Sequence, residues 1–226
     1  NIVNKGGTIL KSARCSEFHK TEGRKKAFET LQKHKIDSLV IIGGDGSFTG
    51  AMIFQSEFKI PVIGIPGTID NDIFGTSHTI GYDTALNTVI DAIDKIRDTA
   101  ISHNRLFFVE VMGRDAGHIA LNAGIAGGAD VILIPEIKYS IDGIIKKLNS
   151  MKKHDIQHSL IIVAEAVKKE DGSTVLHKYM DGEKRLGGIG DYIAQELMKK
   201  TDVECRVTSL GHVQRGAPPT ASDRIL

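Results

Sequence analysis

Residues 38–47, with the sequence SLVIIGGDGS, decide the predicted fold. An apolar run of the length of one strand leads directly into a cluster of glycines, and we expect a helix to follow from about Phe48. Similar apolar runs recur along the chain, at residues 61–65, 105–112, 130–134, 159–165 and 206–210. The sequence therefore predicts a series of buried strands, each of which ends in a turn.

Helical patterns lie between these runs. Apolar side chains recur at three- and four-residue spacing at Tyr82, Leu86, Val89, Ile93 and Ile96, and again at Ile189, Ile193 and Leu197. Strands that are apolar on both faces and are separated by helices indicate an α/β fold, a Rossmann-like three-layer sandwich whose parallel sheet is covered on both sides. A second lobe is expected to begin near Asp130, and the polar residues 168–185 are expected to form a surface insertion.

Composition excludes several classes of protein. The 226 residues carry 29 Lys and Arg against 28 Asp and Glu, a formal net charge of +1, which is unlike a nucleic-acid binder or a polybasic membrane anchor. No apolar run reaches the roughly 18 residues of a membrane span. The two cysteines, Cys15 and Cys205, suit neither a disulfide framework nor a zinc site, which favours the cytoplasm. Because the chain starts at Asn1 and residues 221–226 resemble the first turn of a helix, we expect a fragment of a longer protein.

The first polar segment after a predicted strand is the glycine cluster at residues 43–47. Its backbone amides could approach phosphate oxygens at the start of a helix, and Asp45 could hold Mg²⁺ directly or through water. The alternative is an ordinary tight turn in which Asp45 caps the helix.

The second segment, PGTIDND at residues 66–72, places two carboxylates two residues apart. In an extended loop Asp70 and Asp72 would point to opposite sides, one toward an acceptor hydroxyl and the other toward a metal. Thr68 could donate to a phosphate. The alternative is a turn rich in Asn and Asp, which these residues favour in any case.

The third and fourth segments carry cations. Arg114, in MGRDAG at residues 112–117, could neutralise a transferring phosphoryl group, or it could be a solvated arginine in a turn. His212 and Arg215, in GHVQRG at residues 211–216, suit a sugar phosphate, or they form a polar loop only. Because ligands in such folds bind at the carboxyl ends of strands, we expect the four segments to share one site.

Four motifs in this order, GGDGS, PGTIDND, VEVMGR and LGHVQRG, resemble the bacterial-type ATP-dependent 6-phosphofructokinase family over residues 6–226. The resemblance implies a glycolytic phosphotransferase that moves the γ-phosphoryl group of ATP to the 1-hydroxyl of fructose 6-phosphate, with Mg²⁺ as cofactor. It also implies two similar lobes with the active site in the cleft. We expect an ATP-binding lobe at residues 1–129 and a sugar-phosphate-binding lobe at residues 130–226.

The resemblance implies a role for each matching residue. Asp70 would be the base, Thr68 and Arg114 would stabilise the transferring phosphoryl group, and Asp45 would hold Mg²⁺. The residues expected to contact ATP are Arg14, Cys15, Gly44, Asp45, Gly46 and Ser47. The residues expected to contact the sugar phosphate are Thr68, Asp70, Asp72, Arg105, Met112, Gly113, Arg114, Glu165, Arg206, His212 and Arg215.

The resemblance also implies assembly and regulation. Arg105 and Arg206 would reach the sugar site of a neighbouring subunit, usually in a homotetramer. An effector site for ADP or phosphoenolpyruvate would include Arg97, Gly128, Asp130 and His158.

Two glycines favour ATP as the phosphoryl donor. Pyrophosphate-using relatives carry Asp where Gly46 stands and Lys where Gly67 stands. A carboxylate at Gly46 would repel the α-phosphate of ATP, and a lysine at Gly67 would fill its place. Two alternatives stay open: a non-catalytic or regulatory paralogue or trimmed core of the same family, and a kinase that shares only the GGDG loop and acts on NAD or a lipid.

Overall fold

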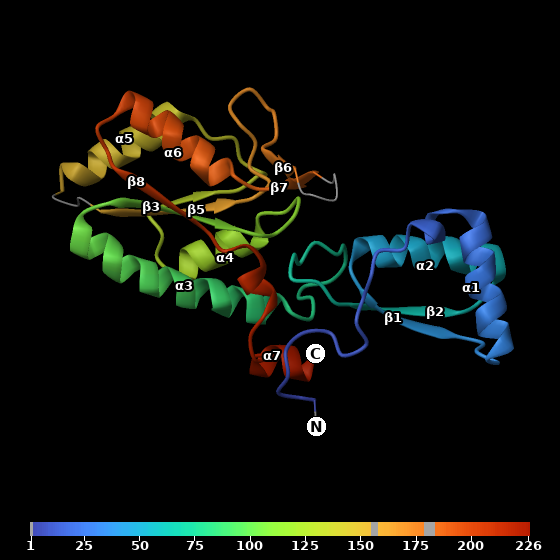
Figure 1. Ribbon diagram of the computed structural model, residues 1–226. Coiled ribbons are helices and arrows are strands. Elements are labelled where there is room, and N and C mark those ends of the chain that lie inside the picture. The colour runs from blue at the N-terminus through green and yellow to red at the C-terminus, as the bar shows by residue number, and fades with distance from the viewer. Residues whose placement is uncertain (1, 155–157, 179–183) are drawn as a thin grey trace.

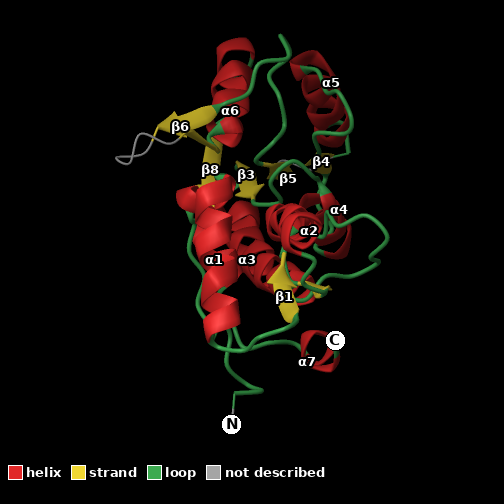
Figure 2. Ribbon diagram, turned by 90° about the vertical axis from the view of Figure 1, so that its right-hand side faces the viewer, coloured by secondary structure: helices red, strands yellow, loops and turns green. Residues whose placement is uncertain are grey.

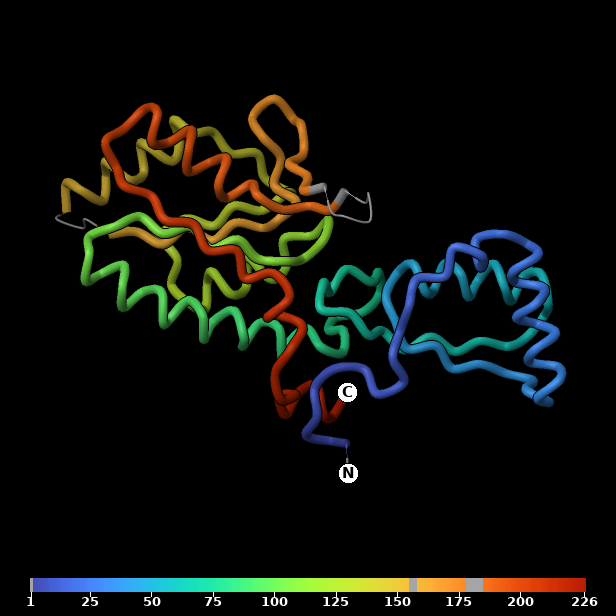
Figure 3. Tube along the Cα trace, in the orientation of Figure 1, coloured from blue at the N-terminus to red at the C-terminus, as the bar shows by residue number. Residues whose placement is uncertain are grey.

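The computed structural model describes residues 2–154, 158–178 and 184–226, which form two α/β units (Figure 1). The first unit contains η1 (Ser16–His19), α1 (Thr21–Lys33), β1 (Leu39–Gly43), α2 (Asp45–Phe58) and β2 (Val62–Pro66). The second unit contains α3 (Tyr82–His103), β3 (Leu106–Val111), α4 (His118–Ala126), β4 (Val131–Leu133), α5 (Ile141–Lys152), β5 (Ser159–Ala164), β6 (Leu176–Lys178), β7 (Lys184–Leu186), α6 (Ile189–Lys200), β8 (Cys205–Ser209) and η2 (Gly211–Arg215). The trace in Figure 3 then ends in α7 (Ala221–Ile225), which confirms the predicted helical turn.

The sheet of the first unit consists of β1 and β2, paired in parallel. α2 packs on one face, where the ring of Phe48 lies against Gly64. On the other face Val40, Ile42 and Ile63 are 63%, 59% and 66% exposed. The expectation of a sheet covered on both sides is therefore wrong for this pair of strands. A continuous apolar run predicts a strand, but it does not show whether helices of the same chain pack on both faces of that strand.

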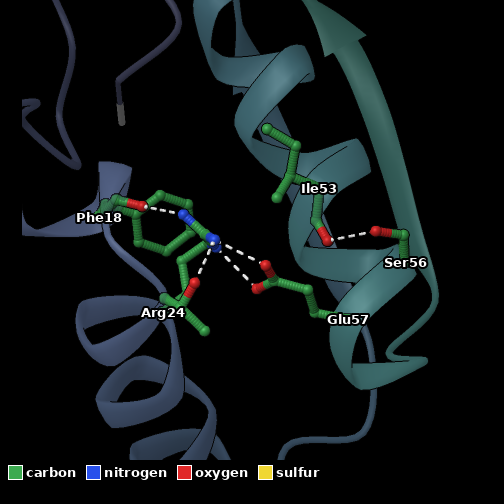
Figure 4. A network of polar contacts seen from close by, with 6 residues as sticks. Phe18, Arg24, Ile53, Ser56 and Glu57 are labelled. Atoms are coloured by element: carbon green, nitrogen blue, oxygen red, sulfur yellow. Dashed lines mark hydrogen bonds and ion pairs between the residues drawn. The ribbon is translucent and has the colours of Figure 1, made fainter.

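An ion pair joins the two helices of the first unit (Figure 4). The guanidinium of Arg24 in α1 donates from Nε to Oε2 of Glu57 in α2 at 2.7 Å and from Nη2 to Oε1 at 2.6 Å, and Nη1 donates to the carbonyl of Phe18. The Arg24 side chain is buried, and aromatic rings stack beside it, Phe28 on Phe58 with centroids 4.7 Å apart. This bidentate geometry fixes the position of α2, the helix that begins at the glycine cluster.

The second unit is a three-layer sandwich, as predicted. Its four strands are parallel in the order β4-β5-β3-β8. α3 and α4 cover one face and α5 and α6 the other, which the view in Figure 2 shows from the side. The side chains of Phe108, Ile161 and Ile162 are fully buried, because β3 and β5 are central strands with helices on both sides.

The four-stranded sheet takes strands from both sides of the lobe boundary expected at residue 130, and that boundary stays a prediction. β3 pairs with β5 and β8, so β3 is a strand of the second sheet. α3, β3 and α4 are therefore part of the second unit rather than of the first. The described units are also unequal, with two and four parallel strands. Local sequence patterns identify strands, whereas the choice of neighbouring strands depends on long-range packing.

Two local features also differ from expectation. α2 begins at Asp45 rather than at Phe48, because Gly44 is extended and its carbonyl already accepts from the amides of Ser47 and Phe48. The polar segment at residues 168–185 contributes an antiparallel hairpin of β6 and β7, at the end of the second sheet that faces the first unit (Figure 1). Across the ranges that the structure describes, no helix combines the length and the apolar character needed to cross a bilayer.

Candidate active site

A pocket of about 1280 Å³ lies between the two units, at the carboxyl ends of the strands of the second sheet. From residues before α3 it is lined by Ala13, Arg14, Cys15, Ser16, His19, Gly46, Ser47 and Asp70. From the second unit it is lined by Glu110, Val111, Met112, Arg114, Asp115, Glu165, His177, Arg185, Leu186, Gly187, Ser209, Gly211, His212 and Arg215. The pocket thus brings together residues of all four predicted segments.

Two residues of the glycine cluster, Gly46 and Ser47, line this pocket. Gly46 and Ser47 lie in the first turn of α2, whose hydrogen-bond ladder begins with Ser47 N donating to the carbonyl of Gly44. The amides of Asp45 and Gly46 precede this ladder, as expected for a helix N-terminus that attracts an anion. Arg14 and Cys15 also line the pocket, and their contact with ATP stays a prediction.

The two glycines used to predict the donor differ in their surroundings. A Cβ on Gly46 would meet no atom within 4 Å, so a side chain there would project into open space at the pocket. A Cβ on Gly67 would stand 2.9 Å from Cγ2 of Ile42. Gly67 is therefore required by close packing against β1, in addition to any effect on the donor.

The segment that carries Asp70 is a closed loop rather than an extended one. Asn71 has a left-handed backbone with φ of 53°, and its side-chain Oδ1 accepts from the amide of Thr79 at 2.9 Å. The hydroxyl of Thr79 donates to the carbonyl of Thr68 at 2.6 Å. Because these contacts fix the loop from both ends, Asp70 is buried while Asp72 is exposed, so the two carboxylates do face different surroundings.

Asp70 is a buried carboxylate that lines the pocket. Its Oδ2 accepts from the hydroxyl of Thr68 at 3.2 Å, whereas Oδ1 has no hydrogen-bond partner among the residues that the structure describes. Burial raises the pKa of Asp70, and the charge of Asp72 adds to this; Arg215 and Arg114 oppose it. A carboxylate with one unpaired oxygen and nearby cations can accept a proton from a bound hydroxyl.

Glu165 holds the turn that carries Arg114. Its Oε1 accepts from the amides of Arg114 at 2.9 Å and Gly113 at 3.3 Å. Gly113 has a φ of 146°, and a Cβ there would lie 2.5 Å from the carbonyl oxygen of Ala116. Burial raises the pKa of Glu165, while these backbone hydrogen bonds lower it. The predicted sugar-phosphate residue Glu165 therefore also orients the backbone of Arg114, whose side chain is exposed beside Asp115.

Gln214 joins two of the predicted segments and was not among the predicted site residues. Its side chain is fully buried; Oε1 accepts from the amide of Met112 at 3.2 Å and Nε2 donates to the carbonyl of Gly211 at 2.9 Å. These contacts hold the ends of β3 and β8 together, so that His212 and Arg215 line the pocket beside Met112.

Glu110 is a second pocket residue that the sequence did not single out. This buried carboxylate accepts from the amide of Gly188 at 2.8 Å and from that of Gly190 at 2.8 Å, at the N-terminus of α6. Its backbone carbonyl accepts from the amide of Leu210. The positive end of the helix dipole and the two amides compensate the buried charge.

Arg105 and Arg206 lie at the opposite edge of the second sheet, where β3 and β8 begin. Nε of Arg105 donates to Oε2 of Glu204 at 3.0 Å, and Arg206 pairs with the other oxygen of Glu204. The Arg105 hydrogen bond lowers the pKa of Glu204. Neither arginine lines the pocket of its own chain, and their role toward a neighbouring subunit stays a prediction.

The residues predicted for an effector site lie near the same edge. Arg97 donates to the carbonyls of Gly127 and Gly128, and Asp130 accepts from the amide of Leu160 at 2.8 Å. His158 lines a separate small cavity of about 20 Å³. The structure thus brings these residues to one edge of the sheet, and effector binding stays a prediction.

Asp45 is the predicted ligand of Mg²⁺. It lies exposed in the first turn of α2, and no group of three or more ligating side chains occurs within the described ranges. Magnesium in phosphoryl-transfer sites is usually bound by one or two carboxylates together with substrate phosphates and waters. A single exposed carboxylate in the first turn of a helix fits that mode of binding.

Fold and pocket together describe an α/β protein with polar residues gathered at the carboxyl ends of its parallel strands, and comparison with known proteins supplies the family. The family model described as phosphofructokinase matches residues 1–226. The chain belongs to the phosphofructokinase family.

Named phosphofructokinases are similar in sequence to the whole of this chain. ATP-dependent 6-phosphofructokinase 2 of Bacteroides thetaiotaomicron is 51% identical over 226 residues, and ATP-dependent 6-phosphofructokinase of Thermoanaerobacter sp. is 52% identical; in each case the match covers 100% of this chain and 64% of the relative. The chain thus spans less than two thirds of the length of these relatives.

Solved structures agree in fold. Phosphofructokinase from Saccharomyces cerevisiae matches with a TM-score of 0.83 at 34% identity, over 99% of this chain and 31% of that chain. The pyrophosphate-dependent phosphofructokinase from Marinobacter aquaeolei matches with a TM-score of 0.75 at 22% identity, over 97% of this chain and 55% of that chain. The latter likeness supports the fold alone.

Proposed function

We propose that this protein transfers the γ-phosphoryl group of ATP to the 1-hydroxyl of fructose 6-phosphate, giving ADP and fructose 1,6-bisphosphate. The observation that carries the proposal is the buried Asp70 carboxylate, whose Oδ1 is unpaired within the described residues and which lies near Arg114 and Arg215. The names of its relatives support ATP as the donor, as does the open space at Gly46.

In this mechanism the chain contributes positioning and charge. Asp70 accepts the proton of the acceptor hydroxyl, while the hydroxyl of Thr68 holds the other carboxylate oxygen. Arg114 offsets the negative charge that the transferring phosphoryl group carries, and His212 and Arg215 bind the phosphate of the sugar. The first turn of α2 receives the phosphates of the nucleotide.

Mg²⁺ belongs to this proposal as a cofactor that Asp45 would hold. The ion would neutralise the charge of the nucleotide phosphates. The proposal also includes a homotetramer in which Arg105 and Arg206 reach the sugar site of a neighbouring subunit. It further includes an allosteric response and a cytoplasmic location. Support for the shared site comes from the exposed position of Arg206 and the half-buried one of Arg105, away from their own pocket.

The test is a coupled assay for fructose 1,6-bisphosphate with the purified protein, Mg²⁺, ATP and fructose 6-phosphate. Asp70→Asn should lower kcat by about 10²- to 10⁴-fold, the usual contribution of a general base, with little change in the binding of fructose 6-phosphate. Asp98→Asn is the matched control, because Asp98 is exposed in α3 and does not line the pocket.

Three results would contradict the proposal. Full turnover by the Asp70→Asn variant would show that Asp70 is not the general base. Binding of fructose 6-phosphate without turnover would favour a non-catalytic member of the family. Turnover of NAD or a lipid in place of the sugar phosphate would favour a kinase that shares only the glycine loop.

A further inference from the structure

α3 begins at a residue that cannot cap it with a side chain. Gly81 is the N-cap of the helix and has a left-handed backbone with φ of 100°, a conformation that favours glycine. Most helices satisfy an amide of their first turn with the side-chain oxygen of an N-cap Ser, Thr, Asp or Asn. This usual acceptor is therefore missing at the start of α3.

The carboxylate of Asp223 supplies an acceptor from α7, 142 positions away from Gly81. Its Oδ1 accepts from the amide of Gly81 at 2.8 Å, and its Oδ2 accepts from the amide of Thr84 at 2.8 Å and from the hydroxyl of Thr84. In a capping box, the N-cap side chain binds the N3 amide and the N3 side chain binds the N-cap amide. Asp223 binds both amides with one carboxylate, whose charge also suits the positive end of the helix dipole.

The chain before α7 is attached to the same end of α3. The hydroxyl of Thr84 accepts from the amide of Thr220 at 3.2 Å. One turn further along the helix, the hydroxyl of Thr88 donates to the carbonyl of Gly216 at 3.4 Å. Thr220 also caps α7, because its hydroxyl accepts from the amide of Asp223 at 3.3 Å. These contacts hold Asp223 beside the start of α3, where Figure 1 shows α7.

The residues that precede Gly81 hold the loop that carries Asp70. The amide of Ile80 donates to the carbonyl of Pro66 at 2.9 Å, and the amide of the buried Thr79 donates to the side chain of Asn71 at 2.9 Å. Pro66 lies four positions before Asp70, and Asn71 follows it directly. The two residues next to the N-cap of α3 thus fix the loop on both sides of Asp70.

We propose that Asp223 is a positioning residue for phosphoryl transfer: it fixes the N-cap of α3 and thereby the loop that carries Asp70. The same contacts tie this loop to the segment of His212 and Arg215, because Gly216 ends that segment and is itself bound to α3. A general base must lie within hydrogen-bond reach of the hydroxyl whose proton it accepts, so a small displacement of Asp70 lowers turnover. This inference rests on the proposed function, in which Asp70 is the base.

The test compares the wild type with Asp223→Ala and Asp223→Asn in the coupled assay for fructose 1,6-bisphosphate. Asp223→Ala should lower kcat by roughly 10- to 10²-fold, as expected for a reacting group that is misplaced by about 1 Å, and leave KM for ATP unchanged. Asp223→Asn keeps one side-chain oxygen as an acceptor and should lose less activity. Ser140→Ala is the matched control, because Ser140 caps α5, binds the amide of Gly143 and does not line the pocket. It should lower Tm through the lost cap and leave kcat unchanged.

Hydrogen exchange of the backbone amides at residues 66–81, followed by mass spectrometry, tests the same contact without turnover. Exchange should be faster in Asp223→Ala than in the wild type and unchanged in Ser140→Ala. An active wild type whose Asp223→Ala variant keeps its kcat, or loses no more of it than Ser140→Ala does, would overturn the inference and leave the proposed function standing. An inactive wild type would end the proposed function, and the role of Asp223 in turnover with it.

Discussion

Replacing Gln214 tests whether one buried side chain couples the two segments that line the acceptor half. Gln214→Met keeps the length of the side chain but removes both polar groups, so the amide of Met112 and the carbonyl of Gly211 lose their partners. An unpaired buried backbone group costs about 1–3 kcal/mol. Because Met112 and Gly211 are half-buried, the lower part of that range applies, and the two losses sum to roughly 2–4 kcal/mol.

The intrinsic fluorescence of the chain makes this loss measurable in the relevant unit. The sequence has no Trp, and all four Tyr follow residue 81, so tyrosine emission during urea unfolding reports on the second unit. Val213→Ala is the control, since this neighbouring side chain is exposed and should change the unfolding free energy by less than about 0.5 kcal/mol. In kinetics, Gln214→Met should raise KM for fructose 6-phosphate and leave KM for ATP unchanged. Equal changes for both substrates, or wild-type stability, would refute the coupling.

Three further perturbations test other parts of the structure. The charge of Asp72 raises the pKa of Asp70, so Asp72→Asn should move the acid limb of the kcat/KM profile to lower pH; an unmoved limb would mean that Asp70 is not the titrating base. Gly46→Asp should raise KM for ATP without lowering Tm, because its side chain enters open space; a lower Tm, or an unchanged KM, would contradict this. The hydrogen bond from Arg24 lowers the pKa of Glu57 in the folded protein. The pair therefore stabilises the fold fully at a pH above the ordinary pKa of a glutamate, and this stabilisation is lost as the pH falls through the lowered pKa of Glu57. Arg24→Met should therefore lower Tm at neutral pH more than in acid, as scanning calorimetry can test, and equal losses at both would disprove it.

Much of the second unit could be predicted because its signals are local. The apolar run at residues 159–165 has the length and composition of a buried central strand, and β5 is found at Ser159–Ala164. The spacing from Tyr82 to Ile96 likewise identified the buried face of α3. The sheet to which β3 belongs could not be predicted, because it depends on the pairing of β3 with β5 and β8 rather than on the residues of β3 itself.

The candidate site shows the same limit at the level of single hydrogen bonds. The motifs predicted that Met112 and His212 lie at strand ends of one pocket, and both line it. The side chain that connects their segments, Gln214, is separated from Met112 by 102 positions. Glu110 is separated from Gly188 by 78 positions, and within its own strand it is a single polar residue in an apolar run. Neither contact has a local signal, since its partner is a backbone amide that every residue type except proline offers.

Glu165 has a structural contact that its predicted role does not include. Its place after an apolar strand is uninformative by itself, and only the resemblance to the family implied a ligand for the sugar phosphate. In the structure its carboxylate accepts from the amides of Gly113 and Arg114, at a turn where Arg114 has a left-handed φ of 52°. Loss of that acceptor would leave two amides unpaired and release a turn that holds Arg114 in a conformation costly for a residue with a side chain. The position of the Arg114 guanidinium near Asp70 therefore depends on the carboxylate of Glu165, which is 51 residues away in the sequence. The motif MGRDAG alone shows that an arginine is present, but it does not show where the positive charge lies in the site.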